Sequence, residues 1–123
     1  MGTFTVAATL IHPLQPERRR TLDLVVDTGA TWTLLPSDVV AEFGLRIGRQ
    51  RTVMLASGEQ VVYPMGQVVM RLGTEELTTI FLAGPPGCQA LLGAVTLEEF
   101  GVAPDPIRKV LIPIVGLLAC QLR

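Results

Sequence analysis

Short apolar runs separated by turn-forming residues dominate the chain, and this pattern predicts strands rather than long helices. The predicted strands, in chain order, span residues 3–11, 22–26, 51–55, 61–72, 77–82 and 110–114. The turn at 56–59 would join the third and fourth strands into a hairpin, and Gly66 is a place where the fourth can bend. Pro113 suits an edge or end position, because proline has no backbone N–H to donate. No linker or low-complexity tract interrupts the pattern, so we expect one all-β domain over residues 1–123.

Two short helices are also predicted, over residues 38–43 and 96–100. Ser37 is a good N-cap for the first, Asp38 lies in its first turn and Gly44 ends it. Gly101 ends the second. Both helices finish on the same Glu-Phe-Gly sequence, and each follows an apolar segment and a glycine. This echo favours a duplicated supersecondary unit, with a chance match as the alternative.

The composition is that of a globular chain with little electrostatic bias. Hydrophobic residues make up 49% and charged residues 17%, which is enough apolar material for a core and argues against disorder. The net charge of −1 gives no electrostatic case for binding nucleic acid or an anionic membrane. The one basic run, Arg18 to Arg20, lies in a predicted loop over 13–20, and we interpret it as solvated.

The termini and cysteines suggest a compartment. Residues 1–6 lack the basic start and apolar core of a signal peptide. The longest apolar stretch, 110–120, is interrupted by Pro113 and is shorter than the ~20 residues of a membrane-spanning helix. Cys88 and Cys120 are too far apart for a CxxC motif or a metal pair, and a disulfide is not favoured in a reducing compartment. We therefore expect a soluble, cytoplasmic protein with unpaired thiols.

The strongest candidate for chemistry is Asp27, which directly follows the apolar run 24–26. A carboxylate at the end of a buried strand lies near low-dielectric surroundings, where its charge is unfavourable. Gly29 lets the backbone turn sharply and lets another backbone approach, and the Thr28 hydroxyl could bond across an interface. The plainer alternative is that Asp-Thr-Gly is only a tight turn.

The flanking residues favour the functional interpretation. Residues 24–36 resemble the active-site segment of aspartic proteases: apolar residues, then Asp-Thr-Gly-Ala, a hydroxyl residue and a short apolar strand. Residues 89–93, Gln-Ala-Leu-Leu-Gly, resemble the second signature of that family, and residues 53–72 between them resemble its flap hairpin. The resemblance covers roughly 22–101 and suits retroviral-type members. Residues 91–98 look most similar to uncharacterised prokaryotic ones.

This resemblance implies a fold, a reaction and a partner. The fold would be a retropepsin-like closed β-barrel with one or two short helices and one lobe per chain. The reaction would be hydrolysis of peptide bonds by a water held between two carboxyls that share one proton, with no metal or other cofactor. Because the chain has a single Asp-Thr-Gly and is too short for two lobes, the second Asp27 would come from another copy in a homodimer.

Roles for further residues follow from the same resemblance. Thr28 would bond across the two-fold axis, and Gly29 and Ala30 would complete the active-site loop that receives the substrate backbone. Ser57, Gly58 and Glu59 would form the flap tip over an extended peptide. Leu91, Leu92 and Gly93 form the second signature, and Val25, Leu91 and Leu92 would wall the pockets. Ala94 departs from the pattern, because retroviral members usually carry an arginine there; Arg46 or Arg108 are possible substitutes.

Other readings have weaker support. His12 is the only histidine and is predicted to lie on a surface loop, so a Ser-His-Asp or Cys-His site is disfavoured, and a zinc site lacks ligands. Asp23, Asp38 and Asp105 read as structural. The main alternative is a protease-fold module that dimerises or binds peptides with little or no turnover. For an active enzyme, Ala30 in place of a hydroxyl residue favours a weakly acidic pH optimum.

Overall fold

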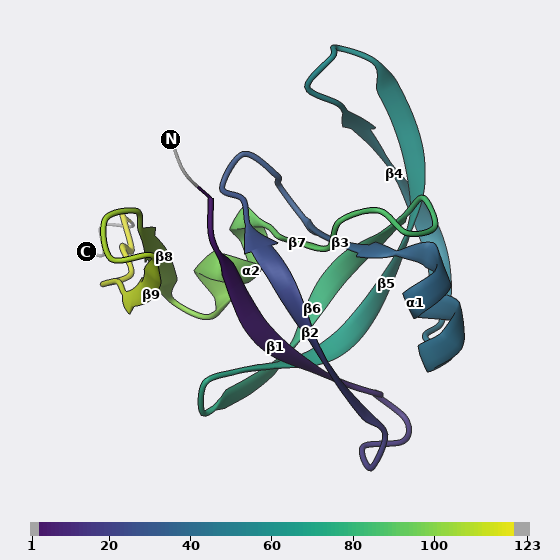
Figure 1. The fold of residues 1–123 in the computed structure, drawn as a ribbon, viewed down its shortest axis with the longest axis horizontal. Coiled ribbons are helices and arrows are strands. Elements are labelled where there is room, and N and C mark those ends of the chain that lie inside the picture. The colour runs from purple at the N-terminus through teal and green to yellow at the C-terminus, as the bar shows by residue number, and fades with distance from the viewer. Residues whose placement is uncertain (1–2, 120–123) are drawn as a thin grey trace, which may run out of the picture.

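A computed structural model describes residues 3–119 of the chain. Within that range the chain forms nine strands and two short helices (Figure 1). In chain order they are β1 (Thr5–Ile11), β2 (Arg19–Val26), β3 (Thr33–Pro36), α1 (Ser37–Phe43), β4 (Ile47–Met54), β5 (Gln60–Leu72), β6 (Glu75–Gly84), β7 (Leu91–Leu92), α2 (Ala94–Glu99), β8 (Val102–Asp105) and β9 (Val110–Pro113).

Seven of the strands form one sheet, and six of them, all but β4, close into a barrel. The strand order in the sheet is β1-β2-β7-β3-β6-β5-β4, and an additional antiparallel pairing of β1 with β5 joins the two sides. The 13-residue strand β5 makes this closure possible, because its first half pairs with β4 and its second half with β6 and β1. The hairpin of β4 and β5 therefore extends away from the barrel, as Figure 1 shows. The predicted closed β-barrel fold with two short helices is confirmed.

Two of the strand pairings in the sheet are parallel. Strand β2 runs parallel to β7, with Val26 opposite Leu92, and β3 runs parallel to β6, with Leu35 opposite Ala83. The two-residue strand β7 also pairs with β3, so it lies between β2 and β3 and connects the two pairs. Residues 66 positions apart (Val26 and Leu92) and 48 positions apart (Leu35 and Ala83) are thereby fixed to one another, and the ends of β2 and β7 meet at one place.

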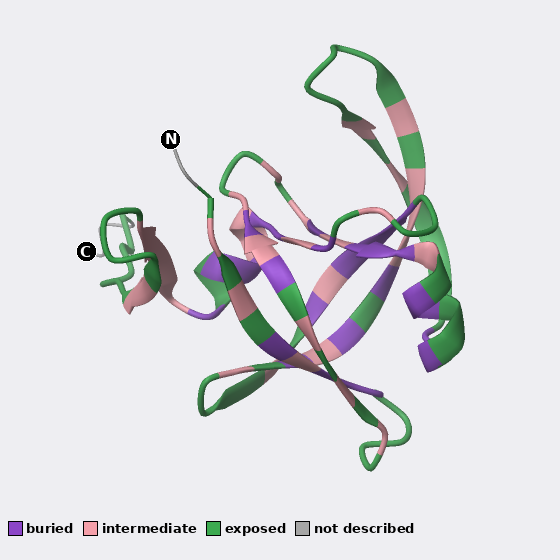
Figure 2. Cartoon of the chain, viewed as in Figure 1, coloured by how far each residue is buried: buried purple, intermediate pink, exposed green. Residues whose placement is uncertain are grey.

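The core fills the inside of the barrel through the two-residue alternation of the strands. Ala8 and Leu10 of β1 point inward, as do Val68 and Met70 of β5, and Phe81 of β6 is completely buried. Figure 2 shows the buried positions gathered where the strands cross, with exposed residues at the ends of the hairpins. Gly66 lies where β5 pairs with both β4 and β6; a Cβ atom there would be 2.6 Å from the Phe81 ring, so the close packing requires glycine.

The helices differ from the prediction at their starts. Ser37 is the first helical residue of α1, and the N-cap is Pro36, with no side-chain capping bond. Helix α2 begins at Ala94 instead of residue 96, again without a side-chain cap. The N–H groups of Ala94 and Val95 donate to backbone carbonyls of residues 30 and 31 instead. No capping side chain is therefore needed, and the sequence contains none that would mark the start of the helix.

The repeated unit seen in the sequence has a structural counterpart. Phe43 and Phe100 are both buried at the ends of their helices. The glycines that follow, Gly44 and Gly101, both adopt positive φ angles of 72° and 65°. Each repeat thus ends its helix with the same aromatic anchor and the same left-handed glycine. The parallel pairings described above join strands of one unit to strands of the other.

Several strands begin earlier than predicted. Arg19 and Arg20 belong to β2 rather than to a loop, and they form exposed ion pairs with Glu76 and Glu42. Charged side chains on the outer face of a barrel strand remain in water, so charge alone was a poor indicator of a loop here. Strand β8, which the sequence did not predict, pairs with the expected last strand β9, and Pro113 lies at the end of that strand as expected.

The prediction of a surface histidine was wrong. His12 is only 7% exposed, its Nε2 donates to the Gly44 carbonyl oxygen at 3.0 Å, and its Nδ1 accepts from the Leu14 N–H. The Nε2 bond thus joins the loop after β1 to the residue that ends α1, and the Nδ1 bond holds the turn within that loop. Cys88 is a free, half-buried thiol, and burial, with the nearby Asp38 carboxylate, raises its pKa. Cys120 lies outside the described residues. No helix within residues 3–119 is long and apolar enough to cross a membrane.

Candidate active site

Asp27 lies at the point where β2 leaves the barrel. The last residue of the strand, Val26, is buried, and Asp27 itself is half-buried. The backbone N–H of Asp27 donates to the Leu92 carbonyl oxygen at 3.1 Å, and that of Val25 donates to Ala90 at 3.0 Å. The parallel pairing with β7 therefore fixes the backbone of Asp27 and presents its side chain beyond the ends of both strands.

The loop after Asp27 is a tight turn that leaves part of the carboxylate free. Asp27 Oδ1 accepts a hydrogen bond from the Gly29 N–H at 3.0 Å, and the Ala30 N–H donates to the Asp27 carbonyl at 3.2 Å. The turn interpretation of Asp-Thr-Gly is thus correct as geometry. It does not exclude chemistry, because among residues 3–119 only Oδ1 is engaged and Oδ2 has no hydrogen-bond partner. Thr28 and Gly29 are exposed beside it.

The first turn of α2 clamps this loop from behind. Ala94 donates its N–H to the Ala30 carbonyl at 2.7 Å, and Val95 donates to the Thr31 carbonyl at 2.9 Å. Gly93 is pressed against the loop so closely that a Cβ atom would lie 2.4 Å from the Trp32 carbonyl carbon. Gly93, the last residue of the second signature, and the first turn of α2 therefore hold the loop that follows Asp27 with backbone groups.

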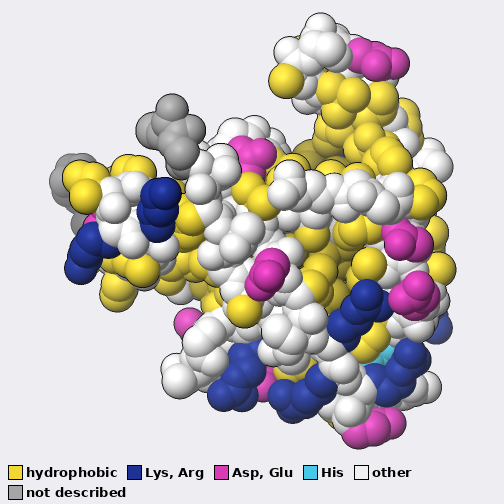
Figure 3. Space-filling model, in the orientation of Figure 1, with side chains coloured by type: hydrophobic (Ala, Val, Ile, Leu, Met, Phe, Trp, Pro, Cys, Tyr) yellow, Lys and Arg dark blue, Asp and Glu magenta, His cyan; other side chains and the backbone are white. Residues whose placement is uncertain are grey.

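A cleft of about 790 Å³ opens in front of Asp27. Its walls come from the active-site loop, the barrel and the hairpin: Asp27, Gly29, Ala30, Thr31, Trp32, Leu34, Thr52, Val53, Met54, Leu55, Ala56, Tyr63, Leu82 and Leu91. Figure 3 shows hydrophobic side chains along the hairpin and around the hollow near its base. Asp27 is the one carboxylate that lines this cleft among residues 3–119.

The β4–β5 hairpin forms one wall of the cleft. Its turn is closed by a hydrogen bond from the Leu55 N–H to the Glu59 carbonyl, and Gly58 has a φ of 90°, which favours glycine. Ser57, Gly58 and Glu59 are all exposed at the tip and lie beyond the residues that line the cleft. In this chain the hairpin contributes residues 52–56 and Tyr63 to the cleft instead.

Comparison with known proteins agrees with this geometry. The family described as gag-polyprotein putative aspartyl protease matches residues 18–99. The chain belongs to this aspartyl protease family. Among solved structures, the protease of EIAV in complex with the inhibitor HBY-793 is similar, with a TM-score of 0.58 and 17% identity, covering 81% of this chain and 89% of that one. At this identity the likeness concerns the fold. No curated protein matched the chain.

The pocket walls predicted for this aspartyl protease chain were only partly right. Leu91 lines the cleft, but Leu92 is fully buried in the core and Val25 is not among the lining residues. Sequence reasoning missed two large side chains of the cleft, Trp32 and Tyr63. They are the only tryptophan and the only tyrosine of an aromatic-poor chain, and this rarity was a signal that could have drawn attention to them.

Trp32 also links the loop of the protease to its hairpin. The guanidinium carbon of Arg51, on β4, lies 5.8 Å from the centre of the Trp32 ring. A cation over an indole face at this distance is attracted by the ring, and the contact joins the base of the hairpin to the residues that follow the Asp-Thr-Gly motif. The position of the hairpin is therefore coupled to the active-site loop.

Within residues 3–119, neither arginine that was considered as a substitute at Ala94 forms a hydrogen bond with the loop that follows Asp27. Arg108 pairs with Asp105 at 2.7 Å, and Arg46 lines a different cavity, so neither takes the place of the arginine absent at Ala94. The Arg108 hydrogen bond lowers the pKa of Asp105.

Asp38 accepts a hydrogen bond from the Gly87 N–H at 2.8 Å, which lowers the pKa of Asp38 and holds the turn before β7 against α1. Asp23 is exposed on β2, as predicted.

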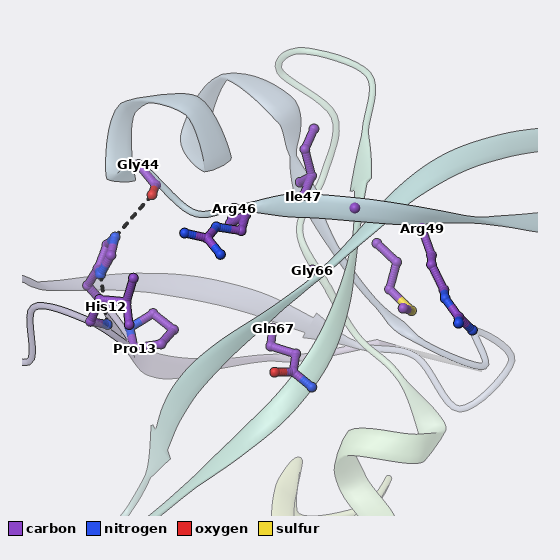
Figure 4. A pocket seen from close by; sticks show the side chains of 11 residues that line it. His12, Pro13, Gly44, Arg46, Ile47, Arg49, Gly66 and Gln67 are labelled. Carbon is purple, nitrogen blue, oxygen red and sulfur yellow. Dashed lines mark hydrogen bonds between the residues drawn. The ribbon is translucent and has the colours of Figure 1, made fainter.

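A second cavity of about 420 Å³ lies on another side of the hairpin base (Figure 4). It is lined by three short segments of the chain: residues 12–14, Gly44 with residues 46–49, and residues 65–67. In Figure 4 Arg46 and Arg49 point in different directions, and the ring of His12 is held by its bond to Gly44. Polar groups do not converge in this cavity, so it is a weaker candidate site than the cleft at Asp27.

Proposed function

We propose that the chain is an aspartic endopeptidase whose active site forms when two copies bring their Asp27 side chains together. The observation that carries this proposal is a half-built site. A single carboxylate with a free Oδ2 lies in an open, largely apolar cleft, held by a rigid turn and walled on one side by a hairpin. One such carboxylate lacks the partner that the reaction requires.

The chemistry needs two carboxyl groups around one water molecule. One must be ionised to take a proton from the water, and the other must be protonated to donate to the carbonyl oxygen of the substrate. Two carboxyls about 3 Å apart satisfy both conditions, since they share one proton. Among the other aspartates, Asp23 is exposed on β2, Asp38 lies in the first turn of α1 and Asp105 ends β8. Because Asp27 is the one carboxylate that lines the cleft among residues 3–119, the second carboxyl in this proposal is the Asp27 of a two-fold-related copy.

The exposed side of the loop is where the partner would dock. Thr28 and Gly29 are exposed next to Asp27, although they belong to a well-fixed turn. In a two-fold dimer, the Thr28 hydroxyl of each copy can donate to the loop of the other and hold the two carboxyls at a constant separation. The catalytic geometry would then depend on rigid backbone elements rather than on long flexible side chains.

The substrate that fits this cleft is an extended peptide with bulky apolar side chains. The β4–β5 hairpin offers backbone groups for an added strand, while Trp32, Leu34, Leu82 and Leu91 offer apolar walls. Closure of the hairpin over the peptide would exclude bulk water from the reacting carbonyl. The tip residues Ser57, Gly58 and Glu59 would contact the partner hairpin or the substrate backbone upon closure.

The decisive experiment is Asp27→Asn with Asp23→Asn as its matched control. Both changes remove one carboxylate charge from β2 or the residue after it, but Asp23 faces solvent away from the cleft. We expect Asp27→Asn to abolish cleavage of apolar peptide substrates while folding and dimerisation persist, and Asp23→Asn to retain activity. A wild-type protein that binds such peptides but cleaves none of them between acidic and neutral pH would instead support the peptide-binding or dimerisation module.

The proposed cellular setting is the cytoplasm. A free, half-buried Cys88 is compatible with a reducing compartment. Fractionation of cells that express the tagged protein would test this localisation, and recovery with membranes or in the medium would contradict it.

A further inference from the structure

Three threonine hydroxyls are buried together behind the active-site loop. Thr33 on β3, Thr79 on β6 and Thr96 on α2 are 0%, 1% and 0% exposed. Their hydroxyl oxygens are joined in series: Thr33 to Thr96 at 2.7 Å, and Thr96 to Thr79 at 2.8 Å. Buried hydroxyls are unfavourable unless they are bonded, and each of these has partners on both sides. The cluster joins three elements that are distant in sequence.

The ends of this series determine the direction of every bond in it. Thr79 donates its single hydroxyl proton to Glu99 Oε1 at 2.6 Å, so it must accept from Thr96. Thr96 then has no proton left for Thr33, and Thr33 must donate to Thr96. At the other end, Thr33 Oγ1 accepts from the Gly93 N–H at 3.1 Å. The result is one continuous donor-to-acceptor chain from Gly93 to the Glu99 carboxylate.

The donor end of this hydrogen-bond series, Gly93, adjoins the residues that hold the Asp27 loop. Gly93 precedes Ala94 and Val95, whose N–H groups hold the Ala30 and Thr31 carbonyls. Bonds aligned in one direction strengthen one another, and a carboxylate at the accepting end increases the effect. The hydroxyl chain therefore fixes the first turn of α2, and the first turn of α2 fixes the loop that carries Asp27.

We propose that Thr33, Thr79 and Thr96 are positioning residues for Asp27, and that they perform the bracing for which Ala94 has no side chain. The proposal rests on the proposed protease function. A core that needed only packing could use valine, which has the same shape, at all three sites. Three mutually bonded buried hydroxyls do something that valines could not do: their directional bonds fix the orientation of α2 relative to the loop.

The test compares Thr96→Val, Thr96→Ser and Thr9→Val. Valine at 96 removes both hydroxyl bonds with nearly unchanged volume, while serine keeps the hydroxyl. Thr9→Val is the matched control, because Thr9 and Thr21 share a similar hydroxyl pair at 3.1 Å on the exposed face of β1 and β2. We expect Thr96→Val to lower kcat by about tenfold or more with KM changed by less than about twofold, since displacement of a catalytic group affects the reacting geometry first. Thr96→Ser and Thr9→Val should stay within about twofold of the wild type.

The pH–rate profile distinguishes positioning from a general loss of stability. A less constant separation of the two carboxyls weakens their sharing of a proton, so the bell-shaped profile of Thr96→Val should become narrower than that of the wild type. An unchanged kcat in Thr96→Val, or a loss of activity equal in Thr96→Ser, would overturn the proposal. All rates are compared at a temperature well below the unfolding midpoint of every variant.

Amide hydrogen exchange tests the same inference without activity. In Thr96→Val the amides of Gly93, Ala94 and Val95 should exchange about tenfold or more faster, while those of the β5–β6 pairing stay unchanged. Unchanged exchange at these three amides would refute the bracing role. If the wild type cleaves nothing while the exchange changes as expected, the protease function fails and the structural brace stands. If the wild type cleaves and both kcat and exchange are unaffected, only this inference fails.

Discussion

Ala94 donates its backbone N–H to the carbonyl oxygen of Ala30 at 2.7 Å. Ala94 directly follows the second signature, at the position where retroviral members of the family usually carry an arginine, and this bond joins it to the loop that follows Asp27. A hydrogen bond from the main chain costs no side-chain conformational entropy, whereas an arginine side chain must be ordered to make its bonds. A residue as small as alanine can therefore provide a rigid connection. The departure at Ala94 therefore changes the means of bracing and leaves the connection in place.

Substitution of this donor should reduce activity. Ala94 is the first residue of α2, a helical position that tolerates proline, and the preceding Gly93 is already extended. Ala94→Pro should keep the helix but lose the bond to Ala30 and crowd that carbonyl, lowering the free energy of unfolding by about 1–3 kcal/mol and kcat by at least about tenfold. Peptide-cleavage kinetics and urea unfolding measure both. Ala94→Ser, which keeps the N–H, is the control, and equal behaviour of the two variants would contradict the bracing role.

Gly93 should be intolerant of any side chain. A Cβ atom there would meet Trp32 backbone atoms at 2.4 Å and 2.5 Å, and backbone cannot move aside as a flexible side chain can. We expect Gly93→Ala to lower the free energy of unfolding by about 2–3 kcal/mol or more. Gly48→Ala is the matched control, because nothing lies within 4 Å of the added atom. A thermal unfolding midpoint for Gly93→Ala equal to that of Gly48→Ala would show that the loop and α2 are less tightly packed than described.

Trp32 should report on occupation of the cleft. It is the only tryptophan, and it lines the cleft beside Asp27. Binding of an apolar peptide to the Asp27→Asn variant should remove water from the indole and shift its fluorescence to shorter wavelength in a saturable way. Arg51→Met, which removes the cation above the ring, should alter the starting spectrum and weaken binding by about twofold to fivefold. Binding detected by calorimetry without any change in fluorescence would place the peptide elsewhere.

Asp38 should make stability depend on pH in the acidic range. Its pKa in the folded protein is lowered chiefly by the Gly87 N–H, relative to the ordinary value of 3.8. A lowered pKa means that the folded state prefers the ionised form, so the stabilisation is present above about pH 4 and is lost as pH falls through the folded pKa. Asp38→Ala should thus lower the unfolding midpoint near neutral pH. The difference from the wild type should shrink toward about pH 2, and a difference that persisted there would contradict the assignment.

The sequence made some parts of this structure predictable for physical reasons. Turn residues and apolar alternation indicated the β4–β5 hairpin and most strands, and the left-handed glycine at the end of each helix marked where α1 and α2 stop. The Asp27 loop was found because its motif is local. These features all depend on residues within a few positions of one another.

Features that depend on distant partners were not predictable in the same way. His12 is buried because Gly44 offers a carbonyl 32 residues away, and a lone histidine before a proline gives no sign of that. Leu91 and Leu92 are adjacent and equally apolar, so the sequence could not tell which faces the cleft; pairing on both sides of β7 decides it. The early start of α2 has a similar cause, since the loop carbonyls replace a side-chain cap.

The central claim is that each copy contributes one Asp27 to a shared site, and subunit mixing tests it most directly. Wild-type and Asp27→Asn chains are unfolded together, refolded in varied ratios at constant total concentration, and assayed on one apolar peptide. A shared site predicts activity proportional to the square of the wild-type fraction, so an equal mixture retains about a quarter of the wild-type activity. Activity that falls in simple proportion to the wild-type fraction, to about half in the equal mixture, would mean that each chain works alone and would contradict this account.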